Sequence, residues 1–185
     1  MKLRFAIAKE ATTAGTRRSD LIDTLYERHL GKVKRWARRL AGPWMDLEDV
    51  VHDIFLIAFR KGFQFRGDAS VETWLFRIAE REIRGKRRRI RLRQALLGLH
   101  QDTLVPPPPD TPQEEMERQE RHARLYRALD RLPDRYRTAL ILFEIEELPG
   151  ERVAEMTGVR LSAVWVTLHR GRERLLRLLT EEDRT

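Results

Sequence analysis

The sequence predicts an all-α protein of two small helical domains joined by a proline-rich linker, the C-terminal one containing a helix-turn-helix. Apolar residues recur at spacings of three and four along most of the chain, and no stretch shows the alternation of a strand. The run Pro106-Pro107-Pro108-Pro109 excludes a helix and favours stiff polyproline II. From Gly150 to Leu178, a short apolar stripe, a glycine and a longer basic stripe follow in the order of a helix-turn-helix.

The composition predicts two kinds of partner and a reducing environment. The 37 Lys and Arg exceed the 29 Asp and Glu in a chain of 185 residues, which leaves a net charge of +8. The acids are too numerous for a simple basic tail, so we expect opposite charges on different faces, one of them for a polyanion. The absence of cysteine excludes disulfides and thiolate zinc sites and fits the cytoplasm. The first apolar run is too short for a signal peptide, and no later run could span a bilayer.

The first predicted helix follows a basic extension over residues 1–18. Ser19-Asp20 supplies a helix start, and Ala41-Gly42-Pro43 ends the helix. Between them, Ile22, Tyr26 and Trp36 belong to one wide apolar face, while the other face is basic.

An acidic face distinguishes the second predicted helix, which Asp46 is expected to cap. Its buried face comprises Leu47, Val50, Val51, Ile54, Phe55, Ala58 and Phe59. Its other face carries Glu48, Asp49, His52 and Asp53, in first turns where negative charge suits the helix dipole. Taken alone, this pattern fits a solvated surface as well as it fits an interface.

A third helix is predicted to begin near Ala69-Ser70, after a loop with two glycines and two aromatic residues. Its apolar positions are Val71, Trp74, Leu75, Ile78 and Ala79. Its second half is densely basic: Arg81, Arg84, Lys86, Arg87, Arg88, Arg89, Arg91 and Arg93. Such a one-signed run predicts a polyanion nearby. The first domain is expected to cover residues 19–95 and the linker residues 96–112.

The C-terminal domain, predicted over residues 113–185, begins with a helix over Gln113–Arg131 and a second helix that restarts at Leu132-Pro133-Asp134. Gly158 is expected to adopt the left-handed conformation in the turn of the helix-turn-helix, and Ser162 to cap its second helix. An ordinary helical hairpin with a solvated charged face is the alternative for this stretch.

Two of these stretches together resemble a known family. Asp46 to Ala79 closely resembles region 2 of extracytoplasmic-function (ECF) sigma factors, and Leu129 to Leu175 is similar to their region 4. The order of the two blocks, the linker between them and the chain length also match that family. The resemblance implies a bacterial promoter-specificity subunit that catalyses no reaction, needs no cofactor and takes no small-molecule substrate. It implies three partners: core RNA polymerase, promoter DNA and an anti-sigma factor that holds the protein inactive, in some cases at the membrane.

The resemblance also implies roles for particular residues. Contact with the clamp helices of the largest polymerase subunit is expected from Asp49, His52, Asp53, Leu56 and Ile57. Recognition of the −10 element is expected from Phe65, Arg66, Gly67, Asp68, Trp74, Arg77, Ile78, Arg81 and Arg84. Recognition of the −35 element is expected from Arg160, Ser162, Trp165, Val166, His169, Arg170 and Arg172.

Some of these assignments have competing interpretations. Trp74 and Trp165 could instead pack inside their domains. The family usually has asparagine at the position of Arg81, and arginine can only donate hydrogen bonds, so the −10 preference of relatives does not transfer.

Two other classes of protein are compatible with parts of the pattern. A two-domain helix-turn-helix regulator that ignores polymerase would not need the acidic face of Asp49, His52 and Asp53. An enzyme could use the same three residues as a metal cluster, but that requires a cavity rather than a plain helix side.

Overall fold

The structure is a computed structural model that describes residues 15–62, 67–97 and 113–182. Every regular element in these ranges is helical and none is a strand, which confirms the all-α prediction. The elements are α2 (Gly15–Ala41), α3 (Leu47–Lys61), α4 (Val71–Leu97), α5 (Gln113–Arg131), α6 (Asp134–Leu140), η4 (Ile141–Ile145), α7 (Gly150–Thr157) and α8 (Leu161–Glu182). Residues 1–14 of the predicted extension, Phe65 and Arg66 of the predicted loop, and residues 98–112 of the predicted linker lie outside the described ranges.

The first helical unit consists of α2, α3 and α4, which pack against one another. The Trp36 ring meets the Phe76 ring edge-on at 5.5 Å between centroids, and the Tyr26 ring is tilted against the Phe55 ring at 4.7 Å between centroids. Such aromatic pairs bury large apolar areas and fix the relative rotation of the helices.

Side-chain caps begin α3 and α4 where the sequence predicts. The Asp46 carboxylate accepts hydrogen bonds from the backbone N–H groups of Glu48 and Asp49, at 2.8 and 3.0 Å. The Ser70 hydroxyl accepts one from the N–H of Thr73 at 3.1 Å. These bonds satisfy donors that have no partner inside the helix.

The second helical unit comprises α5 to α8, with α8 packed against α5, α6 and α7. Val153, Met156, Val164 and Leu168 form the centre of the helix-turn-helix and are all buried. The helix that restarts after Pro133 continues from α6 into a π-helical turn, η4, which the sequence does not predict.

Two predicted boundaries are wrong. Helix α2 begins at Gly15, before the expected start at Ser19, and α4 includes Leu96 and Leu97, which were assigned to the linker. Both errors are at helix ends, where neighbouring residues differ little in propensity.

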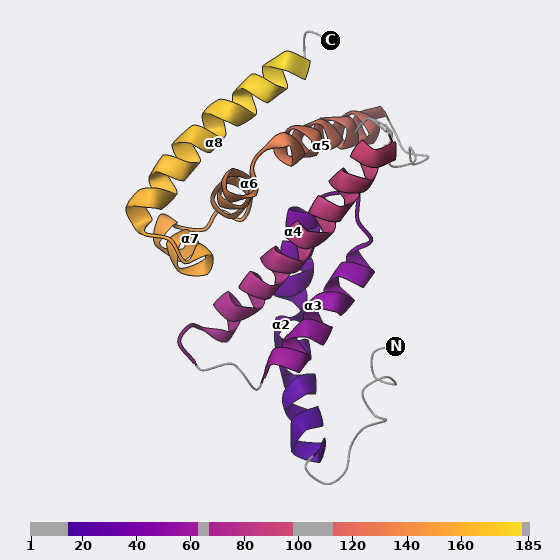
Figure 1. Cartoon of the computed structure of the whole chain (residues 1–185), viewed down its shortest axis with the longest axis vertical. Helices are drawn as coiled ribbons and strands as arrows, with labels where there is room; N and C mark the ends of the chain where they lie inside the picture. The colour runs from indigo at the N-terminus through magenta and orange to yellow at the C-terminus, as the bar shows by residue number, and fades with distance from the viewer. Residues whose placement is uncertain (1–14, 63–66, 98–112, 183–185) are drawn as a thin grey trace.

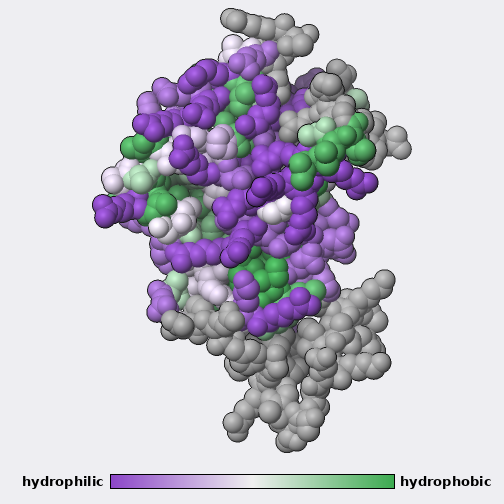
Figure 2. Space-filling model, viewed as in Figure 1, coloured by the Kyte–Doolittle hydropathy of each residue, from purple (hydrophilic) through white to green (hydrophobic). Residues whose placement is uncertain are grey.

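The two units contact each other through α4 and α7. Figure 1 shows α5 to α8 folded back along α4. Hydrophilic residues predominate on the face shown in Figure 2, and hydrophobic residues form separate patches among them. None of the helices in the described ranges has the length and apolar content needed to cross a membrane.

Candidate nucleic-acid and polymerase interfaces

The turn between α7 and α8 has the geometry of a helix-turn-helix. Gly158 has φ +73° and ψ +24°, the left-handed conformation that the sequence predicts for it. Its N–H and that of Val159 both donate to the carbonyl oxygen of Ala154, at 2.9 and 3.2 Å. These bonds end α7 and redirect the chain into α8.

The predicted cap at Ser162 is wrong. Helix α8 already includes Leu161, so Ser162 lies within its first turn rather than before it. The carbonyl oxygen of Arg160 accepts the first bonds of the helix, from the N–H groups of Ala163 and Val164.

The outer face of α8 carries several of the predicted −35 residues. Ser162, Val166 and Arg170 repeat at intervals of four and line one side of a surface groove of about 380 Å³. Arg135 and Tyr136 of α6 line the other side. His169 is also exposed, with its Nε2 atom 3.6 Å from the Glu173 carboxylate. The structure therefore groups Ser162, Val166 and Arg170 on one accessible surface.

Trp165 and Arg172 lie on a different side of α8, against η4. The Trp165 ring is 46% exposed and stands edge-on to Phe143 at 5.5 Å. The Arg172 guanidinium lies over the same Phe143 ring and forms an ion pair of 2.6 Å with Glu144. Arg172 is therefore already neutralised by a neighbour, whereas Arg160 and Arg170 have no carboxylate partner among the described residues.

The predicted −10 residues that the structure describes lie in different environments. Gly67, Asp68 and Arg81 are exposed, and Arg84 is exposed but within 3.2 Å of Glu80. Trp74 is half-buried and packs against the core.

Ile78 does not lie on the DNA-facing surface that was predicted for it. Its side chain is only 9% exposed and belongs to the core of the first unit. It repeats with other buried positions of α4, so its apolar character is explained by packing.

Arg77 contacts the second unit while its side chain stays exposed. Its guanidinium donates to the backbone carbonyl oxygens of Glu155 and Met156, at 3.0 and 3.2 Å. Cations suit the C-terminal end of a helix, where carbonyl groups lack partners. In this arrangement α7 binds the guanidinium group of Arg77, a residue that is predicted to contact the −10 element.

A polar network continues this contact between α4 and α7. The Thr73 hydroxyl donates to Glu155 at 2.9 Å, and Arg152 pairs with Glu72 at 3.3 Å. Glu72 also pairs with Lys32 of α2 at 2.6 Å. Burial acts to raise the pKa of Glu72, but the hydrogen bond and charge of Lys32 outweigh it and the net pKa is lowered.

The predicted polymerase-binding residues form a mixed surface on α3. Asp49 and His52 are exposed, whereas the Asp53 carboxylate is held 2.5 Å from the Lys86 ammonium of α4. Leu56 is half-buried, and Ile57 packs partly against the core. The free negative charge of this face therefore comes from Asp49 more than from Asp53.

Charged side chains are buried between the two units, which the sequence does not predict. Arg137 of α6 is 1% exposed, and its guanidinium donates to the carbonyl oxygen of Leu40 in α2 at 2.6 Å. Arg87 of α4 is 6% exposed and lies 2.9 Å from Asp130 and 3.2 Å from Asp134. The sequence predicts a polyanion for the basic run that contains Arg87, and for Arg87 this is wrong, because two carboxylates of the second unit are its partners.

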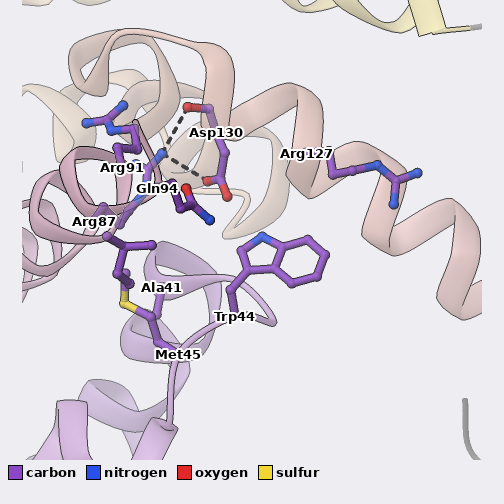
Figure 3. A pocket seen from close by; sticks show the side chains of 9 residues that line it. Ala41, Trp44, Met45, Arg87, Arg91, Gln94, Arg127 and Asp130 are labelled. Atoms are coloured by element: carbon purple, nitrogen blue, oxygen red, sulfur yellow. Dashed lines mark hydrogen bonds and ion pairs between the residues drawn. The ribbon is translucent and has the colours of Figure 1, made fainter. Parts of the chain in front are cut away.

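Asp130 is shared by two arginines. Its Oδ1 atom lies 2.9 Å from Arg87 and 3.2 Å from Arg137, without the angles of a hydrogen bond, so charge attraction dominates. Figure 3 shows Arg87 and Asp130 facing each other across the junction, with Trp44 and Met45 beside them. Burial, followed by the charge of Arg87, lowers the pKa of Arg137 to about 10, so Arg137 remains protonated at neutral pH.

No cluster of three or more potential metal ligands occurs within the described ranges. Asp49, His52 and Asp53 lie on a helix side, and one of them pairs with Lys86.

A helix-turn-helix with an accessible basic face, joined to a second helical unit, defines a class of DNA-binding protein, and sequence comparisons specify the family. The family model described as Sigma-70 region 2 matches residues 25–93, and the one described as Sigma-70, region 4 matches residues 122–175. The chain belongs to the sigma-70 family, in its extracytoplasmic-function group.

Individual relatives agree with this assignment. The chain is 32% identical over 173 residues to RNA polymerase sigma factor YlaC of Bacillus subtilis, covering 89% of this chain and 97% of that protein. It is 34% identical over 154 residues to ECF RNA polymerase sigma factor SigE of Mycolicibacterium smegmatis, covering 83% of this chain but only 59% of that longer protein. These relatives support the sigma-factor interpretation over that of a regulator unrelated to polymerase.

Two solved structures share the fold. Sigma factor RpoE of Bartonella quintana, in complex with the anti-sigma factor NepR, has a TM-score of 0.59 at 23% identity, covering 85% of this chain and 96% of that one. CnrH, in complex with the cytosolic domain of CnrY, has a TM-score of 0.57 at 22% identity, covering 96% of this chain and 94% of that one.

Proposed function

We propose that this protein binds core RNA polymerase and directs it to promoters, with the second unit reading the −35 element as duplex and the first unit reading the −10 element. The observation that carries the proposal is the outer face of α8, where Ser162, Val166 and Arg170 line an open groove beside exposed arginine side chains. Such a helix face suits the major groove, with side chains for base edges and guanidinium groups for phosphates. The chain itself would supply recognition and no reaction.

Polymerase binding is assigned to the exposed side of α3. Asp49 and His52 are accessible there, and Leu56 adds apolar surface beside them. An acidic patch complements the basic clamp helices expected in this family, and complementary charge favours rapid and specific association. Asp53 would contact polymerase either after its ion pair with Lys86 breaks or while that pair is kept.

Reading both promoter elements requires the two units to separate. Elements named −10 and −35 are about 25 base pairs apart, which is about 85 Å of duplex. In the structure α7 packs on α4 and occupies Arg77, so the −10 surface is complete only after α7 leaves. We assign the opened arrangement to the polymerase complex.

An anti-sigma factor is the expected third partner, since one structural neighbour, sigma factor RpoE, was solved in complex with the anti-sigma factor NepR. We place the protein in the cytoplasm with its polymerase, where an anti-sigma factor anchored in the membrane could also hold it.

Transcription by purified core polymerase from a library of genomic fragments tests the proposal. Adding the protein should start transcripts at sites that core polymerase alone ignores. Asp49→Lys should abolish co-purification with core polymerase and this transcription, while binding of duplex DNA survives. Glu117→Lys is the matched control, because Glu117 is an exposed acid on α5 that should leave both unchanged. A protein that binds duplex but adds no start site with core polymerase would be a regulator of the alternative class.

A further inference from the structure

Three arginines converge on one tyrosine at the edge of the helix-turn-helix. The Tyr136 side chain is 2% exposed, and its Cβ atom packs near Gly171 of α8. The guanidinium carbons of Arg135 and Arg174 lie 4.6 and 4.9 Å from the centre of its ring. Arg170 lines the groove beside it. The ring thus forms a rigid support that positions cationic groups from both α6 and α8.

The arginines around Tyr136 have no acidic partner. Among the described residues, Arg135, Arg170 and Arg174 have no carboxylate within ion-pair distance, whereas Arg172 pairs with Glu144 and Arg131 with Glu181. Unbalanced positive charge in one place raises the local potential and attracts an anion.

The Tyr136 hydroxyl group can donate a hydrogen bond. The Nη2 atom of Arg135 donates to the Tyr136 oxygen at 2.8 Å, so the hydroxyl proton remains available for another acceptor. Burial acts to raise the pKa of Tyr136, but the hydrogen bond and charge of Arg135, with the charges of Arg174 and Arg170, outweigh it and lower the pKa. A more acidic hydroxyl is a stronger donor to an anionic oxygen.

We propose that Arg135, Tyr136 and Arg174 bind a phosphate of the DNA backbone, as a clamp contributed largely by α6, beside the base-reading face of α8. The groove that Arg135 and Tyr136 line is open to solvent and continues directly onto Ser162 and Val166. A backbone bordering the major groove would run along it when α8 enters that groove. Phosphate contacts of this kind fix register and orientation without specifying sequence. This inference rests on the proposed binding of duplex DNA, and it adds two residues outside the recognition helix.

The salt dependence of duplex binding by the full chain tests the site. Labelled mixed-sequence duplexes of 30 base pairs serve as probes, because phosphate contacts are independent of sequence. The slope of log K against log salt concentration should become shallower by about 0.9 in Arg135→Ala, the amount expected for one lost phosphate contact. The change should be equal for duplexes of different sequence. Tyr136→Phe should weaken binding and leave the slope unchanged, since it removes a donor but no charge.

Arg131→Ala is the matched control. It removes one positive charge, but that charge is paired with Glu181, so the slope should stay close to that of the unsubstituted chain. The site is overturned if Arg135→Ala leaves the slope unchanged, or if both substitutions lower it equally through net charge alone. Failure of the unsubstituted chain to bind any duplex would remove the proposed function and this site with it. Thermal unfolding confirms that the variants compared are folded.

Discussion

Arginines play opposite parts in two regions of the molecule. At the junction between the units, Arg87 and Arg137 are buried and share the carboxylate of Asp130. At the helix-turn-helix, Arg170 of α8 and the neighbouring Arg135 of α6 are exposed and have no carboxylate partner among the described residues. The difference indicates that paired arginines stabilise the molecule, whereas unpaired ones remain available for a polyanion.

Burial makes the two regions respond differently to substitution. A buried charge that loses its partner retains the full cost of leaving water, whereas exposed pairs are screened and contribute little. Substitutions at the junction should therefore lower the free energy of unfolding. Substitutions on the exposed face around the helix-turn-helix should instead lower the affinity for DNA.

The largest expected effect is that of Asp130→Ala. It leaves Arg87 and Arg137 buried without their shared carboxylate, so we expect a loss of about 3–5 kcal/mol in the free energy of unfolding. Urea denaturation followed by circular dichroism measures it. Glu181→Ala is the control, because it breaks the exposed pair with Arg131 and should cost about 1 kcal/mol or less. Equal small losses in both variants would contradict the role given to the buried charges.

A smaller effect is expected at Gly42, where α2 ends against α5. Gly42 has φ +73°, and a Cβ atom there would lie 2.8 Å from the Tyr126 ring. Gly42→Ala should destabilise by about 1–2 kcal/mol from the backbone alone, with the overlap adding to it. Gly31→Ala, in the middle of α2 with no atom within 4 Å, should instead stabilise by about 1 kcal/mol. Thermal unfolding of both variants checks the sign, and a stabilising Gly42→Ala would contradict this packing.

The elements that local signals define were predictable from the sequence. Asp46 caps α3 and Gly158 forms a left-handed turn, and each interacts only with residues close to it in the chain. Both features occur as predicted. The helix-turn-helix follows from the spacing of its apolar residues for the same reason. Helix ends such as Gly15 were missed because no capping residue marks them.

The parts that were missed depend on residues far apart in the chain. Nothing in the run around Arg87 distinguishes it from its exposed neighbours, because its partners Asp130 and Asp134 approach only when the second unit folds back on α4. The same holds for Arg77, whose acceptors are backbone carbonyl oxygens of α7. The charge density of the basic run in α4 predicted a nearby polyanion. The structure shows that carboxylates of the same chain balance part of that positive charge.

The most direct test of the account is the distance between the two units, free and in the polymerase–promoter complex. The chain has no cysteine, so Glu27→Cys with Glu151→Cys places one fluorophore on α2 and one on α7, both at exposed positions. Energy transfer should be high in the free chain, where α7 packs on α4, and should be lost once core polymerase and promoter DNA are added. Efficient transfer that persists in an actively transcribing complex would contradict the account, because the closed arrangement cannot span both promoter elements.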